Sequence, residues 1–400
     1  MAAPELTVTL CKPLERVVAH GHPWIYRDAL KEREIPAGKV VTVLDRRGRF
    51  LARGLAEAGP IGVRVFTRRD VPVDDALVAA RLDAAIALRR AMWPDDTTAL
   101  RLLHGEGDLL PGAVVDIYGP YAVLRLDGKG IERFRGALVG LLADRLPALG
   151  VETLLARSGR GQTRKVAAVW GTPPTALVEI REHGMRMPAD LLEGQKTGLF
   201  LDHRDERLRV RALAGGRRVL NLFGYTGGFS IAAGLGGATS VDTVDVAPGA
   251  IALANDGWAR NGLDPAQHEG HAMEAEAFLN RAKQRGRRWD LIVADPPSFA
   301  PSEAAKRGAL RAYKALHAAC MAQVADGGLY LGASCSSHVH REDFDGTIRE
   351  AAHVAGVEAQ VLHRGSAGFD HPVPAGFPEG AYLKSTLVRV RRLPGSRGAR

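Results

Sequence analysis

A cysteine in the last fifth of the chain could act as a nucleophile. Cys335 stands in Ser334-Cys335-Ser336, directly after residues 328–334, which are predicted as a strand. A thiolate that adds to C6 of a pyrimidine activates C5 toward a methyl donor, and loss of the C5 proton then expels the thiolate. The alternative for any single cysteine is a small buried hydrophobe. Cys320, in a predicted apolar helix, fits that alternative, whereas the polar neighbours of Cys335 favour catalysis.

A glycine-rich turn and an acidic strand end could hold a nucleoside cofactor. The strand predicted over residues 219–223, with Asn221 and Phe223, runs into Gly224-Tyr225-Thr226-Gly227, where glycine lets the backbone approach a ligand. The spacing matches neither the dinucleotide fingerprint nor the phosphate loop. About 20 residues later Asp245 ends the next predicted strand, where an acid accepts hydrogen bonds from ribose hydroxyls.

Further acidic residues are predicted around the same pocket. Asp242 is an alternative to Asp245, but it falls inside its strand, and Glu274 is predicted near the adenine. Asp295 opens Asp295-Pro296-Pro297, whose prolines fix a rigid corner. At that corner Asp295 can hydrogen-bond the base or the cofactor, so we assign it a catalytic and a cofactor-binding role. The set predicts an S-adenosylmethionine-dependent methyltransferase that acts on a nucleobase, and no metal is expected.

Alternating strands and helices must bring these residues together. From about residue 181 the pattern predicts strands at 219–223, 240–245, 291–295 and 328–334, separated by helices at 228–235, 248–261, 274–285 and 303–325. Such alternation indicates an α/β fold with a doubly wound parallel sheet, which binds ligands at the carboxyl ends of its strands. Asp245, Asp295 and Cys335 are therefore expected at one edge.

Two smaller segments precede this part of the chain. Residues 1–75 read as a basic β-barrel that binds RNA, through arginines that include Arg46, Arg47, Arg53 and Arg64. The alternative is a β module that only packs against its neighbour. Residues 76–180 alternate predicted helices and strands as a central α+β domain, and residues 181–400 complete a three-domain chain.

The bulk composition fits a nucleic-acid partner. A formal net charge of +9 and a sequence pI near 9.7 favour binding to phosphate backbones. Five arginines and no acid among residues 389–400 suggest a frayed basic tail. An odd count of three cysteines predicts a reducing cytoplasm, and no apolar run approaches the roughly 20 residues of a membrane span.

Ordered motifs across nearly the whole chain resemble the RlmI family of large-subunit ribosomal RNA methyltransferases, which methylate cytosine C5. The motifs are His22-Pro23-Trp24-Ile25, Gly194-Gln195-Lys196-Thr197-Gly198, Asp202-His203-Arg204, Phe223-Gly224-Tyr225-Thr226-Gly227, Asp295-Pro296-Pro297-Ser298, Ser334-Cys335-Ser336, Asp370-His371-Pro372 and Phe377-Pro378-Glu379-Gly380-Ala381-Tyr382-Leu383-Lys384. Ser298 departs from the larger residue frequent in the family.

The resemblance implies an N-terminal PUA domain, a central α+β domain and a C-terminal Rossmann-like methyltransferase domain. It implies that Gln195, Lys196, Thr197 and Asp202 line the pocket of S-adenosylmethionine, and that Cys335 is the nucleophile. The substrate would be a cytosine of large-subunit (23S) ribosomal RNA, and whether the chain forms a homodimer stays open.

Two other functions compete with this prediction. A guanine-N7 or exocyclic-amine methyltransferase would need no cysteine, but amine methylators usually carry an aromatic residue where this chain has Ser298. A non-catalytic PUA-type RNA-binding protein would not need an intact cofactor site. Gly224, Gly227, Asp245 and Asp295 argue against that alternative.

Overall fold

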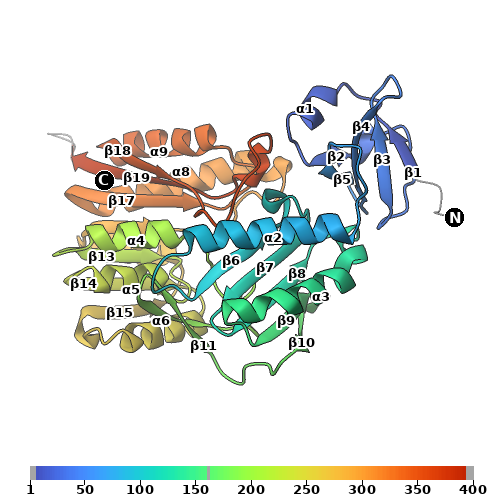
Figure 1. Cartoon of the computed structure of the whole chain (residues 1–400). Helices are drawn as coiled ribbons and strands as arrows, with labels where there is room; N and C mark the ends of the chain where they lie inside the picture. Colours follow the sequence, from blue (N-terminus) through green and yellow to red (C-terminus); the bar gives the residue numbers. More distant parts are fainter. Residues whose placement is uncertain (1–5, 160–162, 393–400) are drawn as a thin grey trace. The chain divides into compact units, whose positions relative to one another are not determined.

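The computed structural model describes residues 6–159 and 163–392, which fall into two compact units (Figure 1). Unit 1 comprises the chain up to residue 178 together with residues 189–201 and 369–380. Unit 2 comprises residues 179–188, 202–368 and the chain from residue 381. Within the described ranges, unit 1 holds two five-stranded sheets and unit 2 holds a seven-stranded sheet.

The first sheet of unit 1 is formed by the N-terminal segment. Its strand order is β1-β3-β4-β5-β2, with β1 parallel to β3 and the other pairs antiparallel. Val8, Ile25, Val41 and Val63 are buried in its own core, which is why short apolar runs form strands here. The elements are β1 (Leu6–Thr9), α1 (Glu15–Ala19), β2 (Trp24–Tyr26), β3 (Val40–Leu44), β4 (Phe50–Ala56) and β5 (Ile61–Thr67).

The second sheet of unit 1 has its own core and follows the order β10-β9-β8-β7-β6. Helices α2 and α3 pack on it through Leu82, Ile86, Leu138 and Leu142. The elements are α2 (Asp75–Met92), β6 (Ala99–His104), β7 (Ala113–Tyr118), β8 (Tyr121–Leu126), α3 (Arg135–Arg145), β9 (Thr153–Ser158) and β10 (Lys165–Trp170). Next in the sequence is a two-stranded sheet of β11 (Val178–Glu182) and β12 (Met185–Ala189), most of whose residues belong to unit 2.

The sheet of unit 2 follows the order β15-β14-β13-β16-β17-β19-β18. Its first five strands in that order are parallel, and β19 lies antiparallel to both β17 and β18. The strands are β13 (Arg218–Leu222), β14 (Ser240–Asp245), β15 (His268–Ala272), β16 (Trp289–Ala294), β17 (Val324–Ser334), β18 (Val357–Gly365) and β19 (Lys384–Arg392). The helices are α4 (Arg204–Leu213), α5 (Gly228–Leu235), α6 (Pro248–Arg260), α7 (Ala275–Gln284), α8 (Lys306–Gln323) and α9 (Arg341–Ala355).

Both faces of this sheet are covered. Val219 packs with α4, α5 and α6 in one cluster, whereas its neighbour Leu220 packs with α7, α8 and α9 in another. Successive strand residues point to opposite faces, so a strand buried on both sides reads as a continuous apolar run. The predicted doubly wound α/β sheet is confirmed.

Several elements differ from the sequence prediction. Edge strand β15 was missed because His268-Glu269-Gly270-His271 lacks an apolar pattern, and α4 was missed because most of its residues are charged. Residues 389–392 end β19 and are not part of a frayed tail, while residues 393–400 lie outside the described ranges. The boundaries 1–75, 76–180 and 181–400 stay predictions. No described helix has both the length and the apolar character needed to cross a membrane.

Candidate functional site

The loop between β13 and α5 is a strained turn that requires glycine at position 227. Phe223 and Tyr225 have φ of 58° and 45°, and Gly227 has φ of 77°. A Cβ on Gly227 would lie 2.7 Å from Cβ of Ala254 on α6, so a side chain there would meet the helix as well as backbone strain. Positive φ at residues other than glycine is concentrated where surrounding structure enforces it, often at ligand sites.

Asp245 fixes this loop from the end of the adjacent strand. Its Oδ2 accepts a hydrogen bond of 2.9 Å from the backbone N–H of Tyr225, and its Oδ1 accepts one of 2.9 Å from Ala247. The half-exposed carboxylate therefore joins the ends of β13 and β14. Each carboxylate oxygen has a further lone pair, which remains suited to a ribose hydroxyl.

A row of hydrogen-bonded polar side chains lies next to this loop. Asn221 Nδ2 donates to Ser230 Oγ at 2.9 Å, Ser230 contacts the Thr243 hydroxyl at 2.6 Å, and Thr243 contacts His268 Nε2 at 2.7 Å. Burial lowers the pKa of His268 to about 4, so this ring is neutral. Among the described residues, Asn221 Oδ1 is buried without a hydrogen-bond partner. A buried unsatisfied acceptor beside a glycine turn fits a bound ligand.

A second strand end carries an ion pair. His203 Nε2 lies 3.1 Å from Asp295 Oδ2, at the corner that follows β16. Burial opposes protonation of His203, but the charge and hydrogen bond of Asp295 and the charge of Asp202 raise its pKa overall. Asp202 Oδ2 accepts a hydrogen bond of 2.7 Å from the Tyr382 hydroxyl. His203 Nδ1 is buried without a partner in the described part of the chain, and it offers a second polar atom for a ligand.

Replacing His203 by glutamine should destabilise unit 2 more at about pH 6 than at about pH 9. A raised folded-state pKa means that the ion pair stabilises the fold fully below the unfolded value of about 6.5 and loses its effect as pH rises through the folded value. We expect a loss of about 1–3 kcal/mol on the acid side. Urea unfolding at both pH values measures it, with exposed His353→Gln as the control. A loss that is equal at both pH values would contradict the charged ion pair.

Cys335 follows the last residue of β17 and is half buried. Ser334 pairs across the sheet with Lys384, the first residue of β19. The Lys384 ammonium is buried and donates to the carbonyl oxygens of Ser336 at 2.7 Å and Tyr382 at 2.8 Å. Burial and the charge of Arg341 lower the pKa of Lys384 to about 8, while the thiolate charge of Cys335 opposes that shift. A cation therefore lies within electrostatic reach of Cys335.

A chain of hydroxyl groups joins the loops that carry Asp295 and Cys335. Ser334 Oγ donates to the Tyr313 hydroxyl at 2.8 Å, Tyr313 contacts Ser336 Oγ at 3.0 Å, and Ser336 contacts Ser298 Oγ at 3.0 Å. Burial raises the pKa of Tyr313, which keeps its hydroxyl protonated. The Ser298 hydroxyl is thus part of the hydrogen-bond chain that joins the two loops.

The other predicted cofactor residues divide between the two units. Asn221, Phe223, Gly224, Tyr225, Thr226, Gly227, Asp245 and Asp295 gather at the carboxyl edge of the unit 2 sheet, and Asp202 joins them through its neighbour His203. Exposed Glu274 follows β15 at the same edge. Thr197 belongs to unit 1, where its hydroxyl contacts Asp116 at 2.5 Å and Tyr118 at 2.8 Å. Gln195 and Lys196 lie in the same segment, and a cofactor role for these three stays a prediction.

The four predicted RNA-binding arginines differ in exposure. Arg46 and Arg47 are exposed, Arg46 pairing with Glu15, and half-buried Arg53 pairs with Asp70. Arg64 is buried, and its guanidinium contacts three acids of unit 1: Glu57, Glu106 and Asp127. Arg64 is thus engaged within the fold, and an RNA contact from this sheet would use the exposed side chains.

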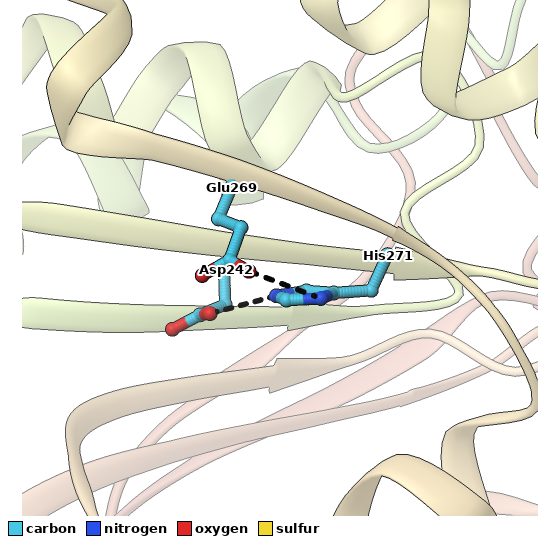
Figure 2. Close-up of side chains that lie close together, drawn as sticks. All are labelled: Asp242, Glu269 and His271. Carbon is cyan, nitrogen blue, oxygen red and sulfur yellow. Dashed lines mark hydrogen bonds and ion pairs between the residues drawn. The ribbon is translucent and has the colours of Figure 1, made fainter.

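Asp242, the alternative acid, lies in a cluster with Glu269 and His271 whose polar atoms fall within 4.8 Å of one another (Figure 2). His271 Nε2 contacts Asp242 at 2.9 Å, and Arg287 and Trp289 donate to the same carboxylate at 2.9 and 2.7 Å. Burial opposes ionisation of Asp242, but these hydrogen bonds and charges lower its pKa overall. A guanidinium already occupies the place of a cation, so the cluster is a structural ion-pair network.

Comparisons with known proteins agree with this geometry. Residues 156–359 match the model of an S-adenosylmethionine-dependent methyltransferase, and residues 8–68 match a PUA-like domain. A ribosomal RNA large subunit methyltransferase of Deinococcus radiodurans is 36% identical, covering 97% of this chain and 98% of that protein. Ribosomal RNA large subunit methyltransferase I of Shigella boydii is 35% identical, covering 96% and 99%.

Solved structures show the same fold. A methyltransferase complexed with SAH superposes with a TM-score of 0.86 at 22% identity, covering 96% of this chain and 99% of that one. A SAM-dependent methyltransferase from Streptococcus mutans gives a TM-score of 0.85 at 22% identity, covering 96% and 100%. The predicted PUA-like and Rossmann-like folds are therefore confirmed.

Proposed function

This chain belongs to the RlmI family of S-adenosylmethionine-dependent methyltransferases, and we propose that it methylates carbon C5 of a cytosine in large-subunit ribosomal RNA. The observation that carries the proposal is the position of Cys335, one residue beyond a strand that ends at the same sheet edge as Asp245 and Asp295. The names of its relatives support ribosomal RNA as the substrate. That substrate also supports a cytoplasmic reaction, as the free cysteines predict.

The cofactor site would use groups that this edge already presents. S-adenosylmethionine, when bound, supplies an electrophilic methyl group. Asp245 would accept hydrogen bonds from its ribose hydroxyls while holding the Tyr225 backbone in place. The unpartnered Asn221 Oδ1 and His203 Nδ1 would turn toward polar groups of the cofactor or the base, which satisfies two buried atoms that the described chain leaves unpaired.

The reaction would proceed through a covalent bond to Cys335. Its thiolate adds to C6 of the cytosine, and the C5–C6 electron pair becomes available at C5. C5 takes the methyl group and the sulfonium–carbon bond breaks. A base removes the C5 proton, and the returning electron pair restores the C5–C6 double bond and expels the thiolate. The enzyme thus ends with the same free thiolate.

Lys384 would favour the thiolate form of Cys335. A free cysteine has a pKa near 8.5, so a neighbouring cation increases the reactive fraction near neutral pH. The two carbonyl acceptors fix the ammonium, and its lowered pKa of about 8 still leaves it mostly charged at pH 7.

Replacing Lys384 by methionine should move the pH profile of Cys335 alkylation to higher pH and slow methyl transfer at about pH 7 by about 10–100-fold. Lys384→Arg keeps the charge, so its alkylation profile and its rate of methyl transfer should lie closer to those of the wild type. Iodoacetamide labelling followed by mass spectrometry measures the profile, and exposed Cys11 is an internal control. An alkylation profile that is unchanged in Lys384→Met would contradict this role and leave Lys384 as a structural residue only.

Tritium release tests the proposed function itself. Large-subunit ribosomal RNA labelled with tritium at cytosine C5 should release label to water, with one tritium released for each methyl group transferred. Methyl transfer without release would instead indicate a guanine or an exocyclic amine as the target. Absence of both transfer and S-adenosylmethionine binding would favour a non-catalytic RNA-binding protein.

A further inference from the structure

An arginine-lined cavity lies at the edge of the unit 2 sheet opposite to the candidate active site. Arg218 begins β13, Ser240 begins β14 and Trp289 begins β16, and all three line a cavity of about 550 Å³. Because parallel strands begin at one edge and end at the other, this cavity faces away from Asp245 and Cys335. Among the described residues, its walls carry five arginines: Arg218, Arg285, Arg287, Arg288 and Arg392.

The charges of these arginines are only partly balanced. Arg218 pairs with Asp290 at 3.1 Å and Arg287 pairs with Asp242 at 2.9 Å. Arg392 donates through its side chain to two backbone carbonyl oxygens, and its backbone N–H to Asp326. The cavity therefore has three carboxylates against five guanidinium groups.

Arg285 and Arg288 are the uncompensated pair. Both side chains are exposed on the turn between α7 and β16, where Gly286 adopts φ of 64°. In the ranges that the structure describes, neither guanidinium makes an ion pair. These two guanidinium groups lie three residues apart on a tight turn. They could bind two oxygens of one anionic group, or two neighbouring anionic groups of one ligand.

The surroundings favour phosphate groups over bases. The aromatic ring in the wall, Trp289, is 1% exposed, and the Arg287 guanidinium lies 5.0 Å from its ring centroid. No face of that ring is free to stack on a base, whereas stacking platforms are typical of sites that hold unpaired bases. Guanidinium groups bind phosphate in a bidentate manner without reading sequence.

We propose that this cavity binds the phosphodiester backbone of the substrate RNA, away from the base that reacts. The inference rests on the proposed RNA substrate and adds a second contact region to it. The cavity would raise RNA affinity without touching the cofactor or the nucleophile.

The double variant Arg285→Gln/Arg288→Gln tests the proposal in the full-length protein. With an in vitro transcript of large-subunit ribosomal RNA, we expect about a tenfold loss of affinity. The slope of log affinity against log salt should fall by about 1.4–1.8, because each lost phosphate contact removes about 0.7–0.9. S-adenosylmethionine affinity and turnover at saturating RNA should match the wild type.

A control variant removes the same charge elsewhere. Arg133→Gln/Arg349→Gln replaces two exposed arginines outside the cavity and should leave affinity and salt slope near the wild type. If the cavity variant binds the transcript like the wild type while the wild type binds and methylates it, the cavity proposal is wrong and the proposed function stands. A wild-type protein that does not bind the transcript would overturn both.

Discussion

Cys335→Ala should reduce methyl transfer to RNA by at least about 10⁴-fold, because the proposed mechanism needs the Cys335 thiolate to form the bond to C6 that activates C5. The site around the lost thiol should persist. Cys335 is half buried, and hydrogen bonds among the hydroxyl groups of Ser334, Tyr313 and Ser336 hold its loop. S-adenosylmethionine affinity should therefore stay close to that of the wild type.

The measurement is single-turnover transfer of labelled methyl groups to large-subunit ribosomal RNA, with cofactor binding followed separately by calorimetry. Cys335→Ser is a second variant, because its hydroxyl keeps the size but is a far weaker nucleophile at C6. Cys11→Ala, on an exposed cysteine of unit 1, is the matched control and should be fully active. A Cys335→Ala enzyme with normal transfer would remove the thiolate from the mechanism.

Asp245→Ala should weaken S-adenosylmethionine binding by about 30–100-fold. The carboxylate accepts charge-assisted hydrogen bonds from the backbone N–H groups of Tyr225 and Ala247, and it is proposed to accept further ones from the ribose. Losing such bonds costs about 1.5–3 kcal/mol. The substitution would also remove the hydrogen bond from the Tyr225 backbone N–H to Asp245, which helps to hold Phe223 and Tyr225 at positive φ.

Thermal unfolding with and without cofactor measures this effect. A ligand that binds the folded state raises its stability by mass action, so the cofactor-dependent rise in melting temperature should shrink strongly in Asp245→Ala at a fixed concentration. Glu358→Ala removes an exposed carboxylate from β18 and should keep the full rise. A full rise in Asp245→Ala would exclude this strand end from the cofactor site.

The residues at the carboxyl edge of the unit 2 sheet could be predicted because each has its signal in the residues next to it in the sequence. An apolar run leads directly into the glycine turn at residues 224–227, Asp245 ends the next predicted strand, and an apolar run precedes both Asp295 and Cys335. Burial on both faces forces these runs to be apolar, and the parallel sheet then brings their ends to one edge.

The residues that support this edge could not be predicted in the same way. Lys384 lies beside the end of β17 only because β19 pairs antiparallel with that strand, and Tyr382 donates to Asp202 from far along the chain. His203 precedes α4, and most residues of α4 are charged, so its sequence lacks the apolar periodicity that predicts a helix. Long-range pairing leaves no local signal, so the family resemblance marked these motifs but could not tell a structural role from a functional one.

Arg64 shows how composition misleads. A high local density of arginines suggested an exposed basic face, but β5 is buried along most of its length, and Val63 and Val65 flank Arg64. A strand buried on both faces can hold an arginine only with acids around it, and Glu57, Glu106 and Asp127 fill that role. Sequence alone did not reveal those partners.

Covalent trapping on RNA that contains 5-fluorocytidine tests the central claim most directly. Once a thiolate has added to C6 and C5 has taken the methyl group, the fluorine at C5 cannot leave as a proton does, so the thiolate cannot be expelled. The wild-type protein should form an adduct with this RNA that survives denaturation and depends on S-adenosylmethionine, and peptide mapping should place the bond on Cys335. A protein that methylates unmodified ribosomal RNA but forms no adduct, or forms one at another residue, would contradict the proposed mechanism.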